Sequence, residues 1–126
     1  MSKTVIATNN APGALGPYSQ GIATDNLIFT SGQIPLNPAD GSFVNEDIAT
    51  ATRQVLENVK AVLNEAGADM KDVVKTTVLL SDMDNFAAMN EVYGTYFTDK
   101  PPARACFQVA KLPMGALVEI EAIAVK

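Results

Sequence analysis

The sequence has no histidine and only one cysteine among its 126 residues. Histidine is the commonest general base and a common metal ligand, so its absence excludes Ser–His and Cys–His dyads and the usual zinc sites. The single cysteine, Cys106, cannot form an internal disulfide, which agrees with a reducing compartment. No metal-ligand spacing, dinucleotide fingerprint or P-loop is present either. Any chemistry must therefore proceed without imidazole, and the sequence offers no pattern of metal ligands.

Long apolar runs and basic residues are also scarce. No run approaches the ~20 residues that span a bilayer, and Met1–Thr4 has none of the apolar character of a signal peptide. We therefore expect a cytoplasmic protein with no membrane partner. The chain carries 9 basic and 14 acidic residues, a net charge of -5, so nucleic acid is not an expected partner.

Hydrophobic residues make up 48% of the chain and charged residues 18%, which excludes a disordered protein. The length suits one domain, residues 1–126, with a sizeable core. Apolar periodicity and turn residues predict six strands and two helices. The strands are expected at Lys3–Ala7, Tyr18–Thr24, Leu27–Ser31, Val73–Leu80, Ala103–Val109 and Val118–Val125, and the helices at Asp47–Ala66 and from Ser81–Asp84 to Phe97. Asp25-Asn26 is expected to form a hairpin turn, and residues 32–45 a long exposed loop.

This order predicts an α+β domain, a mixed sheet with two helices on one face. Several strands are apolar on both faces, most clearly Val73–Leu80. Two helices cover one face only, so another copy of the chain is the simplest cover for the second. A homo-oligomer is therefore expected.

Arg104 stands out among the candidate site residues. Strand alternation places it on one face with Cys106 and Gln108, with no acidic neighbour in the strand. Two interpretations remain open: an ion pair between strands or subunits, or a two-pronged grip on a carboxylate or phosphate.

Glu119 and Glu121 share one face of the last strand. They can both be exposed, or one can lie beside Arg104 on an adjacent strand and hold a water or move a proton. Asn90 lies in the apolar stripe of the second helix, where its amide makes either a structural bond or a contact to ligand. Tyr18 is expected to place its ring partly in the core and its hydroxyl at an edge.

Four strings in order resemble the YjgF/RidA family over essentially the whole chain. These are Gly16-Pro17-Tyr18-Ser19-Gln20, Thr30-Ser31-Gly32-Gln33-Ile34-Pro35, Pro102-Ala103-Arg104-Ala105-Cys106 and Val118-Glu119-Ile120-Glu121-Ala122-Ile123-Ala124. The resemblance implies a chorismate-mutase-like fold, a homotrimer with a central barrel, and sites in clefts between subunits. It also implies cofactor-independent hydrolysis of reactive 2-enamino and 2-imino acids to 2-oxo acids and ammonia.

The resemblance also implies roles for individual residues. Arg104 matches the carboxylate-binding arginine, and Glu119 matches the glutamate that positions water. Tyr18 is a further candidate for proton transfer. The substrate-lining candidates are Ser31, Gly32, Asn90 and Cys106, the last through its backbone N–H. The connection at residues 98–102 looks shorter than in some members of this family. A shorter connection would change the rim of the cleft and therefore the range of substrates.

The sequence is compatible with three other functions. The first is a non-catalytic module that binds small carboxylates, because a fold does not fix a function. The second is RNA cleavage or inhibition of translation, which the net charge and the missing histidine disfavour. The third is a holdase chaperone, on which the sequence is silent.

Overall fold

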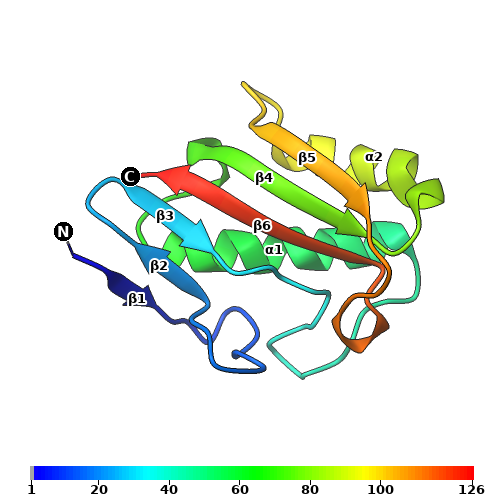
Figure 1. The fold of residues 1–126 in the computed structure, drawn as a ribbon, viewed down its shortest axis with the longest axis horizontal. Coiled ribbons are helices and arrows are strands. Elements are labelled where there is room, and N and C mark those ends of the chain that lie inside the picture. Colours follow the sequence, from blue (N-terminus) through cyan, green and yellow to red (C-terminus); the bar gives the residue numbers. More distant parts are fainter. Residues whose placement is uncertain (1) are drawn as a thin grey trace.

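The computed structural model describes residues 2–126, in which two α-helices pack on a six-stranded sheet (Figure 1). The strand order across the sheet is β1-β2-β3-β6-β4-β5. The strands are β1 (Thr4–Ile6), β2 (Gly21–Ala23), β3 (Leu27–Thr30), β4 (Val73–Leu80), β5 (Ala103–Gln108) and β6 (Val118–Val125), and the helices are α1 (Ile48–Glu65) and α2 (Phe86–Tyr96). Short 3-10 helices cover Met70–Asp72, Met83–Asn85 and Pro113–Gly115. The predicted α+β class is confirmed.

The sheet is mixed. β4 and β5 are parallel and joined through α2, whereas all other neighbours are antiparallel. Val78 of β4 pairs with Cys106 on one side and with Ile120 on the other, so these three side chains share one face. β4 is therefore an interior strand, as predicted, while β5 forms an open edge of the sheet.

Both helices lie on the same face of the sheet (Figure 1). Asp47 begins α1 by accepting a hydrogen bond from the backbone N–H of Thr50 at 2.8 Å. Val55, Val59 and Val62 recur at steps of four and three residues, and all are buried. The predicted first helix is thus confirmed to within a residue at each end.

Alternation along β6 separates the two faces of the sheet. Its helix-facing residues are buried in the main core: Val118, Ile120, Ala122 and Ala124. No helix covers the opposite face within residues 2–126, where Phe29, Phe107 and Val125 are 38%, 53% and 41% exposed. This exposed apolar face is consistent with the predicted homo-oligomer, which stays a prediction.

Three predictions for residues 18–45 are wrong. Residues 32–45 are not an exposed loop throughout, because Gln33 pairs with Ile120 and Ile34 is buried in a small second core with Leu112. The strand predicted from Tyr18 begins only at Gly21, since the backbone turns at Tyr18, whose N–H bonds to the carbonyl of Gly16. The Tyr18 ring is 47% exposed and thus lies outside the core.

The hairpin turn at Asp25-Asn26 is confirmed by the bond from Thr24 N–H to the Leu27 carbonyl, 2.8 Å. Among the helices of residues 2–126, none has the length and apolar character needed to span a bilayer.

Candidate active site

Arg104 lies on the edge strand β5 and faces α2. It pairs with Thr76, a buried residue on the helix-facing side of β4, so the Arg104 side chain extends to that side as well. Its Nη1 donates a hydrogen bond of 2.7 Å to Oδ1 of Asn90. The Asn90 amide therefore makes a structural bond, and that bond orients the arginine.

The Arg104 guanidinium has no acidic partner within the described part of the chain. Among residues 2–126 the salt bridge that forms joins Lys71 and Asp72, and no carboxylate lies within 4.0 Å of Arg104. An ion pair inside the subunit is thereby excluded. Asn90 supplies a neutral acceptor, so the full positive charge stays available to an anion.

Cys106 follows Arg104 by two residues and is half-buried against the main core. Burial raises the pKa of its thiol, and the nearby Arg104 charge opposes this only in part. The thiol therefore stays protonated and is a poor nucleophile. The N–H of Val109 bonds to β4, and backbone alternation then turns the N–H groups of Arg104 and Cys106 toward the open edge.

A second group of site candidates lines a cavity of about 360 Å³. Four of the candidate site residues meet there: Tyr18, Ser31, Gly32 and Glu119. The remaining lining residues are Leu15, Ile34, Pro113 and Glu121. The cavity thus combines a carboxylate pair with hydroxyl groups and a small apolar wall.

Glu119 packs directly over Gly32. A Cβ built on Gly32 would overlap the Glu119 carboxylate, so glycine is required here for close approach. Partial burial is the main cause that raises the pKa of Glu119, and the charge of Glu121 adds to it. Glu119 consequently accepts a proton more readily than an exposed carboxylate does.

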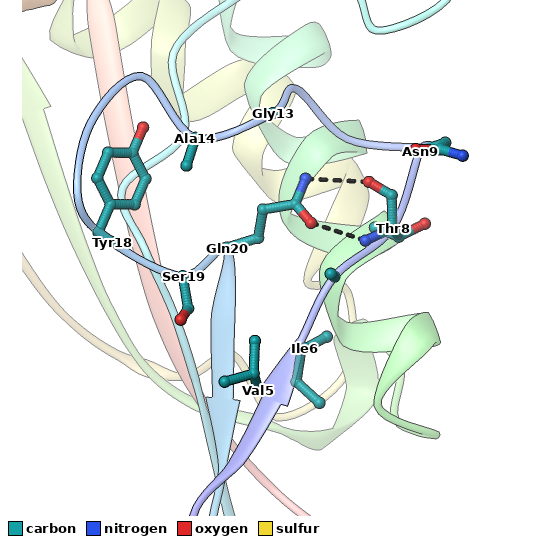
Figure 2. A pocket seen from close by; sticks show the side chains of 10 residues that line it. Val5, Ile6, Thr8, Asn9, Gly13, Ala14, Tyr18, Ser19 and Gln20 are labelled. Carbon is teal, nitrogen blue, oxygen red and sulfur yellow. Dashed lines mark hydrogen bonds between the residues drawn. The ribbon is translucent and has the colours of Figure 1, made fainter.

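The loop that carries Tyr18 is anchored by Gln20. The buried amide of Gln20 bonds to the backbone of Thr8 in both directions, at 2.7 and 3.0 Å, and also to the carbonyls of Ala11 and Pro12. Figure 2 shows this amide turned toward Thr8, with the Tyr18 ring at the other end of the loop. The Tyr18 hydroxyl accepts the N–H of Leu15 at 2.9 Å, so its own proton remains free to be donated.

The two groups lie on opposite faces of one sheet. Glu119 pairs with Leu79 on the face without helices, whereas Arg104 faces α2. β4 also separates β5 from β6. The hypothesis that Glu119 or Glu121 lies beside Arg104 on an adjacent strand is therefore wrong within one subunit, because the period of two in each strand sends the side chains apart.

Comparison with known proteins identifies the relatives of this chain. The sequence profile of the family described as endoribonuclease L-PSP matches residues 8–126. The chain belongs to this family.

Family members of known sequence and structure match over nearly the full length. The 2-iminobutanoate/2-iminopropanoate deaminase of Escherichia coli K12 is 52% identical over 100% of this chain and 99% of that protein. The structure of YyfA from Yersinia pestis, described as a member of the conserved Rid protein family, has a TM-score of 0.95 and 48% identity, covering 99% of this chain and 100% of that one. The structure of E. coli TdcF with bound serine has a TM-score of 0.94 and 45% identity, covering 98% of both chains. The resemblance to the YjgF/RidA family is thus confirmed.

In this family member the structure adds residues that the sequence did not single out as functional. Phe86 and Tyr93 lie with their rings under the Arg104 guanidinium, at 5.5 and 4.8 Å from its central carbon to the ring centres. The spacing in the sequence places Phe86, Asn90 and Tyr93 on one stripe of the second helix. Only the fold shows that Arg104 lies over this stripe. No group of three or more acidic or cysteine side chains among residues 2–126 is arranged to hold a metal.

Proposed function

We propose that this protein hydrolyses small 2-imino acids, and the 2-enamino acids that tautomerise to them, to 2-oxo acids and ammonia. The observation that carries the proposal is the Arg104 guanidinium, which is held in place by a neutral amide and has no acid beside it. An arginine that is fixed in this way and keeps its charge can bind a substrate carboxylate through two hydrogen bonds. Relatives from E. coli and mouse, 52% and 50% identical, are named for this reaction.

The active site is proposed to form between subunits of a homotrimer. Arg104 and Glu119 cannot meet inside one chain, since they project from opposite faces of the sheet. The open edge of β5 and the apolar face with Phe29 and Phe107 both need a cover. A second copy that docks at this edge supplies the cover and brings its own Glu119 to the Arg104 of its neighbour. The three sheets then enclose a central barrel.

Each site candidate has a role in this arrangement. Arg104 binds the substrate carboxylate, helped by the outward N–H of Cys106, while Asn90 holds the guanidinium through its side-chain oxygen. The neighbouring subunit contributes the cavity with Glu119, Tyr18 and the Ser31-Gly32 segment. Gly32 of that segment lies directly against the Glu119 side chain. The segment is held in place by the hydrogen bond that the Ser31 hydroxyl donates to the Ser19 carbonyl.

The proposed reaction needs no covalent nucleophile, since a protonated imine carbon is already electrophilic. Glu119 orients a water toward that carbon and accepts the proton that the water releases on attack. The new C–O bond gives an amino alcohol, whose nitrogen takes up a proton, with Tyr18 as a donor within the cavity. The C–N bond then breaks and ammonia leaves. The hydroxyl proton passes back to the Tyr18 oxygen, which gives the 2-oxo acid, and Glu119 releases its proton to solvent. Position and proton transfer supply the rate enhancement.

The decisive experiment measures ammonia and 2-oxobutanoate after threonine dehydratase generates the imine in the presence of this protein. Acceleration above the spontaneous rate, in proportion to the enzyme added, is expected. A rate equal to that of dehydratase alone contradicts the proposal and favours a carboxylate-binding module instead. The cytoplasmic location expected from the sequence stays a prediction.

Replacing Gly32 with alanine tests the placement of Glu119. The new methyl group takes the space of the Glu119 carboxylate, which swings away because it is the free end of a flexible side chain. We expect kcat to fall by as much as about 100-fold with the fold retained, since small misplacements cost this much. Steady-state kinetics and circular dichroism check both parts.

Gly94→Ala is the matched control for Gly32→Ala. A Cβ at Gly94, within α2, meets no atom within 4 Å. This variant should keep full activity and gain about 0.5–1 kcal/mol of stability from the better helix former. Unchanged kcat in Gly32→Ala would show that the position of Glu119 does not matter.

A further inference from the structure

Arg104 is held by one face of α2, through contacts that leave its charge unneutralised. Phe86, Asn90 and Tyr93 follow one another at steps of four and three residues, so they share a face of the helix. Asn90 accepts the hydrogen bond of 2.7 Å from Nη1. The two rings lie under the guanidinium carbon at centroid distances of 5.5 and 4.8 Å. These distances are within the range in which a cation is attracted to an aromatic ring.

The ring of Tyr93 is itself fixed by the core. Its hydroxyl shares a hydrogen bond of 2.7 Å with Thr76, which is buried, and its ring packs on Phe97 at 4.6 Å between centroids. Burial is the main cause that raises the pKa of Tyr93, so the phenol stays neutral and cannot form an ion pair with Arg104. Tyr93 thus provides a rigid and uncharged platform.

We propose that Phe86 and Tyr93 are positioning residues that hold the Arg104 guanidinium in its anion-binding orientation by cation–π contact. A flexible arginine loses side-chain entropy when it binds an anion, and a carboxylate partner that fixed it would neutralise it. Aromatic faces fix the side chain and leave its N–H groups free for a substrate. The role in catalysis rests on the function proposed above, whereas the effect on the arginine does not.

Leucine at either position removes the ring and keeps much of the volume. For Phe86→Leu and Tyr93→Leu we expect KM for the imine and Kd for 2-oxobutanoate to rise about fivefold to tenfold, because one cation–π contact is lost. The value of kcat should change less than threefold. Tyr93→Phe keeps the ring and loses the bond to Thr76, so it should stay within about twofold of the unmodified protein.

Tyr96→Leu is the matched control, since Tyr96 belongs to the same helix but bonds to Glu57 of α1 at 2.6 Å. It removes a ring without touching Arg104 and should leave KM and Kd unchanged. If Tyr93→Leu does not fold, Phe86→Leu decides alone, because Phe86 is only half-buried at the first turn of α2. Values of KM and Kd within twofold for Phe86→Leu overturn the proposal.

A measurement without substrate separates this proposal from the proposed reaction. The chain has only two arginines, Arg53 and Arg104, so the side-chain Nε–Hε region of a ¹H–¹⁵N spectrum holds two signals. The rings should displace the Arg104 signal, and Phe86→Leu should move it toward that of the exposed Arg53. A signal that does not move refutes the contact even if the enzyme is active. A signal that moves supports it even if no imine is hydrolysed.

Discussion

Arg104→Ala should lower kcat/KM for the imine by about 10- to 150-fold. The variant loses one charge-assisted interaction with the substrate carboxylate, which is worth about 1.5–3 kcal/mol. The fold should survive, because Arg104 is only half-buried and its polar partner is the half-buried amide of Asn90. Initial rates of ammonia release in the coupled assay check the prediction.

Two variants make the Arg104→Ala result specific. Arg104→Lys keeps the charge but loses the two-pronged geometry, so its activity should lie between that of Arg104→Ala and that of the unmodified protein. Arg53→Ala removes the other arginine, which is exposed on α1, and should change nothing. Hydrolysis by Arg104→Ala at nearly the normal rate means that the substrate carboxylate is bound elsewhere.

A mixture of two inactive variants should regain activity when their subunits assemble together. Glu119→Gln is expected to lower kcat by about 100-fold, because an amide cannot accept the proton from water, and to affect binding of 2-oxobutanoate much less. A site between subunits is intact when its Arg104 comes from a Glu119→Gln chain and its Glu119 from an Arg104→Ala chain. With equal amounts and random assembly, about one quarter of the sites in a closed ring are intact.

The expected result for the co-expressed variants is therefore about one quarter of the normal activity per subunit. The same proteins purified separately and mixed without subunit exchange should stay inactive, as should the double variant Arg104→Ala/Glu119→Gln. Light scattering on each preparation tests the trimer directly. Absence of any recovery in mixed trimers shows that the two residues do not act in one site between subunits.

The local patterns of the sequence were sufficient for most of the elements. The repeat of Val55, Val59 and Val62 predicted α1, and the β-branched run of Val73–Leu80 predicted a buried strand. The loops were less predictable. Ile34 is buried because Leu112 and Ala116 come from far along the chain to cover it, and no local pattern signals that contact.

The sequence also predicted which residues share a face within each strand, but it did not predict the order of the strands in the sheet. Alternation placed Arg104 with Cys106 and Glu119 with Glu121, and both pairings are confirmed. The strand order is set by pairing over long distances in the chain. It decides that β4 separates these strands and that their functional side chains point to opposite faces.

The sequence by itself determined the chemical inventory: no imidazole, one arginine with no acid in its strand, and strands apolar on both faces. These properties depend on residue type and on the alternation of side chains between the two faces of a strand, and both can be read from short stretches of sequence. Only the tertiary structure decided that α2 places two rings and an amide against Arg104, and that Glu119 lies over Gly32. Such contacts join residues that are distant in sequence, so they exist only after the sheet has fixed its order and the helices have packed on it.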